Sequence, residues 1–161
     1  MDKPFHRTLD DFTPGQVFEH WPRKTVTESD NNLFCLLTMN HNPLHLDSQY
    51  AASRPQGRIV VAGTYVLSLV VGLSVADISG AAIANLGFEK VVHHEPVFAG
   101  DTIAARSEII SVQPSRRQPD RGIITVQTEA FNQDGVKVLS FRRKVLLPRE
   151  IASLRSPRCD P

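Results

Sequence analysis

Acid–base and hydrogen-bonding side chains gather in one short segment, Asn40-His41-Asn42-Pro43-Leu44-His45-Leu46-Asp47. An imidazole titrates near pH ~6.5, so a histidine here can take up or release a proton close to neutral pH. The Asn42-Pro43 pair is typical of a turn, which would direct the side chain of His45. Asp47 precedes Ser48, and we interpret it first as the cap of a short helix rather than as a reacting group. The segment predicts an acid–base site centred on His45.

A second position of chemical interest lies at the start of the longest uncharged stretch, residues 59–76. Small and hydroxyl side chains within it, and the lack of flanking Trp or Lys, argue against a membrane span. We expect instead a buried helix over about 61–78. Gly63, near the amino end of that helix, can offer a backbone N–H to a negatively charged oxygen, and it has no side chain to block the approach.

The rest of the first half supplies short elements that would hold these groups. Thr27-Glu28-Ser29-Asp30 has the form of a capping box and predicts a helix that ends near Met39. A second short helical piece is expected over 47–53. Residues 16–27 are β-tolerant but broken by Trp21-Pro22, which indicates an irregular or edge strand.

The second half changes to an alternating pattern that predicts strands over 81–92, 102–112, 123–131 and 136–147. Asn132-Gln133-Asp134-Gly135 predicts a hairpin between the last two, because glycine reaches positive φ without steric cost. Strands that follow one very apolar helix favour an α+β fold in which an antiparallel sheet wraps around a long central helix. Because such a sheet leaves a strand edge open, we expect a homodimer or a higher even oligomer.

The composition narrows the function classes. The 161 residues fit one domain, expected over 1–148, with a flexible tail over 149–161. A net charge of +1 indicates neither nucleic acid nor a membrane surface as partner. Two cysteines form no disulfide framework, and the amino terminus does not resemble a secretory signal, so we expect a cytoplasmic protein.

The adjacent His93 and His94 superficially suggest a metal site. Neighbouring residues of a strand point to opposite faces of the sheet, so the two imidazoles cannot readily share one ion, and no carboxylate spacing completes a ligand set. We therefore predict no metal.

Three runs of the sequence resemble the MaoC-like dehydratases, or (R)-specific enoyl-CoA hydratases, which have the hot-dog fold. That family has the pattern Gly-Asp-x-Asn-Pro-x-His-x-Asp, which Asn42, Pro43, His45 and Asp47 match. Residues 57–63 are similar to the family's approach to the central helix. Phe88 followed by residues 96–102, Pro-Val-Phe-Ala-Gly-Asp-Thr, resembles the entry to a strand.

The resemblance has one chemically important departure. Asn40 stands where the family has its catalytic aspartate, and Val61-Ala62 stands where many members have Ala-His before the glycine. An asparagine can orient a water molecule, but its amide cannot take up a proton. Three interpretations stay open: His45 alone moves protons while Asn40 orients water, Asp47 or Asp30 supplies the missing acid, or the site binds acyl-CoA without turnover.

The resemblance implies reversible addition of water to an α,β-unsaturated acyl-CoA thioester, with branched or dicarboxylic substrates of the mesaconyl-CoA type as one option. The catalytic groups would then be His45, Asn40 and Gly63, and no cofactor is needed because CoA is part of the substrate. The residues expected to bind substrate are Arg58, Asn42, Asp47, Val61 and Ala62. Arg58 is the first choice for the CoA phosphates among the basic residues Arg58, Arg106, Arg116, Arg117, Arg142, Arg143 and Lys144, although solvated strand surface explains each of these equally simply.

Two other function classes remain as alternatives. A non-catalytic acyl-CoA-binding protein would keep the groove and lack turnover. A thioesterase would need a carboxylate aimed at the carbonyl from the central helix, and that helix offers only Asp77 near its far end.

Overall fold

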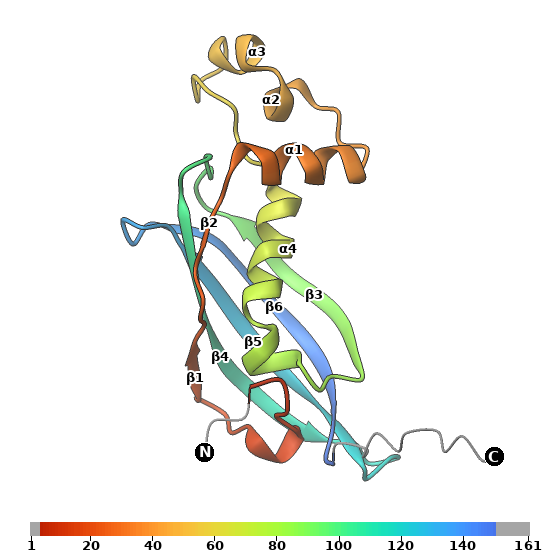
Figure 1. Ribbon diagram of the computed structural model, residues 1–161. Coiled ribbons are helices and arrows are strands. Elements are labelled where there is room, and N and C mark those ends of the chain that lie inside the picture. Colours follow the sequence, from red (N-terminus) through yellow and green to blue (C-terminus); the bar gives the residue numbers. More distant parts are fainter. Residues whose placement is uncertain (1–3, 151–161) are drawn as a thin grey trace, which may run out of the picture.

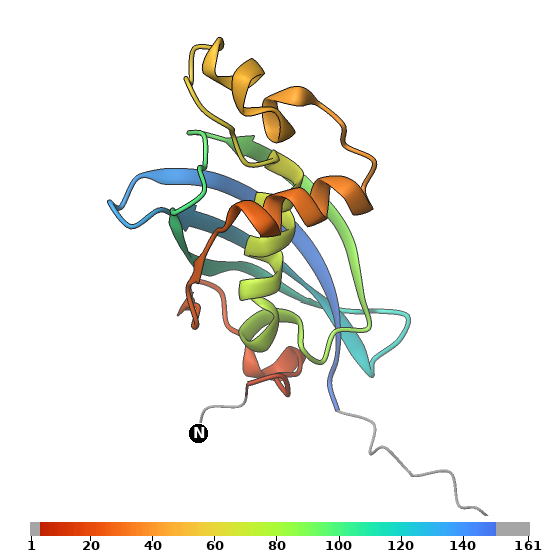
Figure 2. The same cartoon turned by 45° about the horizontal axis from the view of Figure 1, so that its top comes forward.

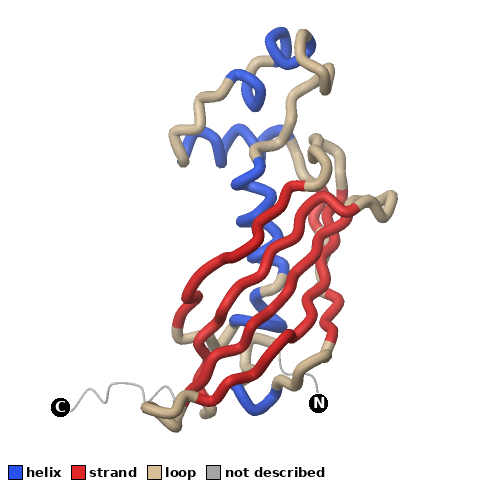
Figure 3. Tube along the Cα trace, turned by 180° about the vertical axis from the view of Figure 1, so that it is seen from behind, coloured by secondary structure: helices blue, strands red, loops and turns tan. Residues whose placement is uncertain are grey.

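The computed structural model describes residues 4–150 as one curved antiparallel sheet with a helix on its concave side (Figure 1). The main strands are β3 (Ala84–His93), β4 (Thr102–Pro114), β5 (Arg121–Phe131) and β6 (Lys137–Pro148). Two short strands, β1 (Val17–Glu19) and β2 (Lys24–Thr25), both pair with β4. The strand order in the sheet is β1-β4-β5-β6-β3, and β2 pairs with β4 outside this order. Figure 3 shows the sheet from behind with the helix beyond it.

Strands β4, β5 and β6 confirm the alternating pattern, whereas most of the edge strand β3 is exposed, and β5 and β6 form the expected antiparallel hairpin. On β5 and β6 the inward residues are buried, among them Ile124, Val126, Phe141 and Val145. The expected strand over 16–27 is two short pieces, separated by the Trp21-Pro22 bond, which is cis. A short 3-10 helix, η1 (Leu9–Asp11), places buried Leu9 against the β5 end of the sheet.

Helix α4 (Gly63–Leu73) is the central helix, and it buries Val66 and Val70 against Phe141 and other core residues of the sheet. The helix is shorter than the expected span of 61–78, because a π-helical turn, η2 (Val75–Ser79), follows it. The change occurs at Ser74, whose Oγ donates to the carbonyl of Val71 at 2.7 Å and whose N–H is shared between the carbonyls of Val70 and Val71. Within residues 4–150, no helix is both long and apolar enough to cross a membrane.

Helix α1 (Glu28–Leu37) has the predicted capping box. The Thr27 hydroxyl accepts the Asp30 N–H at 3.1 Å, and the Asp30 carboxylate accepts the Thr27 N–H at 2.9 Å. The same carboxylate accepts from Lys24 Nζ at 2.7 Å, and this bond together with the Thr27 contacts lowers the pKa of Asp30 to about 2. The helix stops before Met39, which has a positive φ of 59°.

Two further short helices, α2 (Pro43–Leu46) and α3 (Ser48–Ala52), extend beyond the end of the sheet (Figure 2). The sequence predicted only a turn at Asn42-Pro43. Asn42 in fact caps α2 by accepting the Leu44 N–H at 3.0 Å, and Pro43 occupies the first turn, where its missing N–H costs nothing. The predicted cap of α3 is confirmed, because Asp47 Oδ1 accepts the N–H groups of Gln49 and Tyr50.

Buried polar groups fix the carboxyl end of α4 to the sheet. The His20 ring contacts Asp77 Oδ2 through Nδ1 and the Ser107 hydroxyl through Nε2, both at 2.8 Å. Arg143 donates from Nη2 to Ser74 Oγ at 2.8 Å, and burial lowers its pKa to about 10. The interpretation of Arg143 as solvated surface is therefore wrong: it lies on the inward face of β6, beside Phe141, and is fully buried.

The tail expected over 149–161 lies largely outside the described residues. Its first residue, Arg149, donates its N–H to the Asp120 carbonyl at 2.8 Å, which joins the end of β6 to the loop between β4 and β5.

The buried His20 predicts a stability that depends on pH. Burial holds the pKa of His20 below 6.5, although Asp77 opposes the shift. Below pH ~6.5 the unfolded chain therefore binds more protons than the folded chain, and stability is lost on acidification. Urea denaturation at pH 5.5 and 7.5 should give a lower midpoint at pH 5.5. His20→Gln should reduce the difference between the two midpoints, whereas the exposed control His94→Gln should keep it. A difference in His20→Gln as large as in the wild-type protein would contradict the assignment.

Candidate active site

A cavity of about 270 Å³ opens at the amino end of α4. Its lining joins residues from α2, from the start of α4 and from the end of β3, including His45, Gly63, Val66, His93, Glu95 and Val97. Two of the three predicted catalytic residues, His45 and Gly63, thus meet at one site.

The His45 ring is held in a defined tautomer. Its Nδ1 lies 2.7 Å from the carbonyl oxygen of Val60, and since a carbonyl only accepts, Nδ1 carries the proton. Nε2 is then left with a lone pair that can accept a proton from a bound molecule. The main chain supports the same orientation, because the His45 N–H donates to the carbonyl of Asn42 at 3.0 Å. His45 therefore has the geometry of a general base.

Asn31 joins the histidine segment to the helix terminus. Its Nδ2 donates to the carbonyl of His45 at 2.8 Å, and its Oδ1 accepts the N–H of Ala62 at 2.9 Å. The side chain is almost fully buried, with 1% of its surface exposed. One amide thus fixes α2 relative to the first turn of α4, across 31 residues of sequence.

Gly63 begins α4 and faces the ring of His93. A Cβ at Gly63 would lie 3.0 Å from Cε1 and 3.1 Å from Nε2 of that ring, which is closer than ordinary van der Waals contact. The position therefore favours glycine for steric reasons. The free N–H groups of the first helical turn, with the positive end of the helix dipole, lie beside the cavity.

Asn40 does not line this cavity in the described structure. Its Oδ1 accepts the N–H of Asn42 at 3.4 Å, and its own N–H donates to the carbonyl of Cys35 at 2.9 Å. Neither candidate for the missing acid lies there either. Asp47 caps α3, and Asp30 is bonded to Lys24 and to Thr27.

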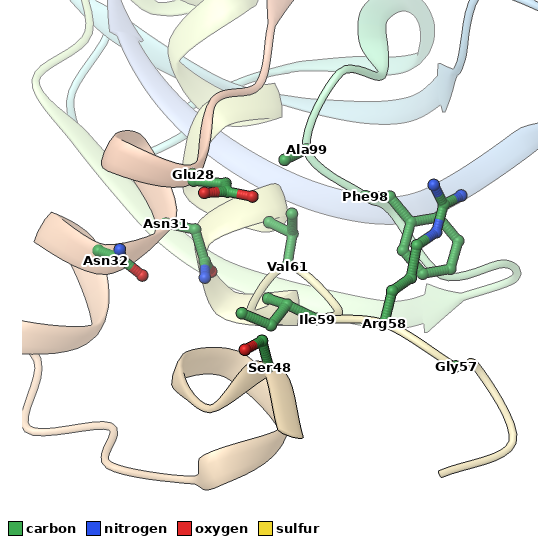
Figure 4. Close-up of a pocket in the computed structure, with 10 residues that line it drawn as sticks. All are labelled: Glu28, Asn31, Asn32, Ser48, Gly57, Arg58, Ile59, Val61, Phe98 and Ala99. Atoms are coloured by element: carbon green, nitrogen blue, oxygen red, sulfur yellow. The ribbon is translucent and has the colours of Figure 1, made fainter. Parts of the chain in front are cut away.

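A second cavity of about 330 Å³ is lined by two of the predicted binding residues, Arg58 and Val61 (Figure 4). Arg58 stacks on the Phe98 ring, with its guanidinium carbon 3.7 Å from the ring centroid. Val61 borders both cavities, whereas Ala62 is fully buried and contributes only its backbone N–H to Asn31. Asn42 and Asp47 are engaged as helix caps. The structure therefore brings Arg58 and Val61 to a cavity wall, but not Asn42, Asp47 or Ala62.

Sequence reasoning missed two residues of this site, Asn31 and His93. Asn31 lies one turn before buried Cys35 on α1, so a polar residue on the apolar side of that helix was the available signal. His93 was considered only as a metal ligand. The prediction that His93 and His94 point to opposite faces of the sheet is confirmed. His93 covers Gly63, whereas His94 Nε2 contacts the Ser140 hydroxyl at 2.8 Å.

A family model described as the MaoC like domain matches residues 11–130 of the chain. The chain belongs to the MaoC-like domain family. The match runs from η1 to the end of β5 and includes α2, which carries His45, and all of α4. The family named from the sequence is thus confirmed, while the role of Asn40 at the position of the aspartate stays a prediction.

Known relatives of this MaoC-like domain include two hydratases. Mesaconyl-CoA hydratase of Haloarcula marismortui is 30% identical over 139 residues, which are 86% of this chain and 39% of that protein. The (R)-specific enoyl-CoA hydratase of Aeromonas caviae is 32% identical over 115 residues, covering 71% of this chain and 81% of that protein. The chain therefore spans about two fifths of the length of the first relative.

The fold is confirmed by a solved structure. A Mycobacterium tuberculosis protein described as having a double hot-dog fold matches with a TM-score of 0.80 at 23% identity, over 98% of this chain and 47% of that chain. The MaoC-like domain studied here is thus an α+β hot-dog fold, as its sequence predicted.

The two hydrogen bonds by which Asn31 joins the His45 carbonyl to the Ala62 N–H form a clamp between α2 and α4. We predict a large loss of stability when the Asn31 side chain is truncated. Asn31→Ala would leave the Ala62 N–H and the His45 carbonyl without their partner, and each unsatisfied buried group costs about 1–3 kcal/mol. We expect urea denaturation to show a loss of about 2–3 kcal/mol. The exposed neighbour supplies the control, since Asn32→Ala should change stability by no more than about 0.5 kcal/mol. Equal effects of the two variants would refute the clamp.

Proposed function

We propose that this MaoC-like domain is an acyl-CoA hydratase/dehydratase, which adds water reversibly across the C2=C3 bond of an α,β-unsaturated acyl-CoA thioester. The observation that carries the proposal is the placement of His45, with Nε2 available as a base, in one cavity with the first residue of α4. The two hydratase relatives, at 30% and 32% identity, support the same reaction class.

The geometry fits the charge changes of the reaction. Water attacks C3 as His45 Nε2 removes its proton, and negative charge develops on the thioester oxygen. The N–H of Gly63 and the positive end of the α4 dipole stabilise that oxygen. The enolate then takes up a proton at C2, which gives the 3-hydroxyacyl thioester. Reversal of the same steps expels water.

For the substrate we propose a CoA thioester whose acyl group is short and branched or dicarboxylic, of the mesaconyl-CoA type. Support comes from the name of the Haloarcula relative and from the small volume of the His45 cavity, about 270 Å³. Arg58 is exposed at the rim of the neighbouring cavity, where its guanidinium, held flat on Phe98, is available to a CoA phosphate.

We also propose that the domain acts as a homodimer. The edge strand β3 exposes several apolar side chains: Leu86, Phe88, Val91 and Val92. Pairing of β3 with β3 of a second copy would cover these side chains and would hydrogen-bond the unpaired backbone groups of the edge strand. A cytoplasmic setting stays a prediction.

A second candidate is acyl-CoA binding without turnover. Asn40 favours it, because the amide that stands at the family's aspartate cannot exchange a proton. This candidate expects thermal stabilisation by acyl-CoA without product. Hydrolysis has less support, since the Asp77 carboxylate, the candidate on the central helix, contacts His20 at the other end of α4.

The test of the hydratase is a comparison of histidine variants with crotonyl-CoA and mesaconyl-CoA, followed by loss of enoyl absorbance. His45→Gln should lower kcat/KM at least ~100-fold, the usual range for a general base being about 10²–10⁴. His41→Gln is the matched control, because His41 is exposed and does not line the cavity, and it should keep wild-type activity. Activity that survives His45→Gln would place the site elsewhere, and free-thiol release would indicate hydrolysis.

Two glycines of α4 give a second, steric test. Gly63→Ala places a methyl 3.0 Å from the His93 ring, whereas a Cβ at Gly72 would meet no atom within 4 Å. We expect Gly63→Ala to lower kcat/KM at least ~10-fold. Gly72→Ala should leave kcat/KM unchanged and raise stability by up to about 1 kcal/mol, since alanine favours the helix. Equal activity in the two variants would show that the first turn of α4 does not contact the thioester.

A further inference from the structure

The cavity of His45 contains a second imidazole that the family resemblance does not assign. His93 is the last residue of β3, and it pairs across the sheet with Leu139 of β6. Leu139 is fully buried on the inward face, so His93, opposite it, also points inward, toward α4. His94 points to the other face, where its Nε2 contacts Ser140. The placement of His93 at the cavity thus follows from the register of β3 and β6.

The His93 ring lies beside Gly63 in the cavity at the amino end of α4. It covers the Cα of Gly63, with Cε1 and Nε2 nearest to the position that a Cβ would take. The first turn of α4 is the donor to the thioester oxygen in the proposed reaction, and C2 is bonded to the carbon of that thioester group. A side chain beside Gly63 is therefore next to C2, whereas His45 reaches the cavity from α2.

The ring is also available for chemistry. Within residues 4–150, no hydrogen bond engages the side chain of His93, and the ring is exposed toward the cavity mouth. The other titratable groups that border the cavity are His45, Glu95 and His94, and Nε2 of His94 is engaged with the Ser140 hydroxyl. Tyr65, the titratable residue nearest on α4, packs against Phe34 of α1, with ring centroids 5.4 Å apart.

The carboxylates that the sequence offered in place of the missing aspartate are already engaged. Asp30 binds Lys24, and Asp47 caps α3. The reaction needs two proton transfers, one from water and one to C2, and a separate acid–base group at C2 would leave His45 to serve the water.

We propose that His93 is the second catalytic acid–base residue, which delivers the proton to C2 in hydration and removes it in dehydration. This inference rests on the proposed function. In hydration, His45 takes H⁺ from water as the C3–O bond forms, and protonated His93 gives H⁺ to C2 as the enolate electrons form the C2–H bond. One water is added. His45 then loses its proton to solvent and His93 regains one, which restores the starting state.

The proposal separates two proton transfers that can be measured independently. Butyryl-CoA has no double bond and no 3-hydroxyl group, so it cannot be hydrated or dehydrated. Exchange of its C2 protons in D₂O, followed by NMR, therefore reports the group that serves C2. The variants are His93→Gln, His45→Gln, Glu95→Gln and the control His41→Gln, which is exposed and does not line the cavity, each with its melting temperature measured.

We expect His93→Gln to lower both crotonyl-CoA hydration and butyryl-CoA exchange at least ~100-fold. His45→Gln should lower hydration equally but keep most of the exchange, and His41→Gln should keep both. Added imidazole should partly restore exchange to His93→Ala, because the cavity then has room for the missing ring.

Three outcomes would overturn the assignment. Hydration by His93→Gln within about threefold of His41→Gln, with wild-type protein active, would refute the role of His93 and leave the proposed function intact. Loss of exchange in Glu95→Gln instead of His93→Gln would assign the proton to the carboxylate. A wild-type domain that hydrates no enoyl-CoA would remove the proposed function, and the role of His93 with it.

Discussion

The site depends on one buried amide. Asn31 donates to the carbonyl of His45 and accepts the N–H of Ala62, so a single side chain fixes the distance between the general base and the amino end of α4. Because both partners are main-chain groups, the clamp constrains the backbone rather than a flexible side chain. The buried amide stabilises the fold because, without it, each of its two main-chain partners would carry the desolvation cost of an unsatisfied group.

The two ends of α4 are secured by different means. At the amino end the contacts are the Asn31 amide and the backbone of residues 60–61, which bonds to Leu44 and Val97. At the carboxyl end a buried polar cluster, His20 with Asp77 and Arg143 with Ser74, joins the helix to the sheet. These hydrogen bonds lie among largely buried side chains, and they act by holding the helix in register. The reacting groups stay at the opposite end, where the helix N–H groups are free.

If Asn40 stands at the position of the family's aspartate, as the resemblance implies, protons must move by another route, because an amide cannot take one up. Asn40 uses its amide to shape the turn before α2, and the nearby carboxylates of Asp30 and Asp47 cap helices. The cavity instead brings together residues from three elements far apart in sequence, with His45 on α2, Gly63 on α4 and His93 on β3. Two imidazoles with a helix terminus between them can serve the two carbons of one double bond.

The sequence by itself determined the fold class, the hairpin of β5 and β6, the capping box of α1, the Asp47 cap of α3, and the choice of His45 and Gly63. These features depend on alternating polarity, side-chain caps and turn residues. Each of these is set by residues close together in the sequence. Only the tertiary structure decided that Arg143 is buried, that Asn31 joins α1 to both His45 and Ala62, and that His93 meets Gly63. Each of these contacts joins segments more than ten residues apart, and the register of β3 against β6 and the packing of α1 on α4 set them. No local pattern carries that information, because the same histidine or asparagine would read as surface in a different packing.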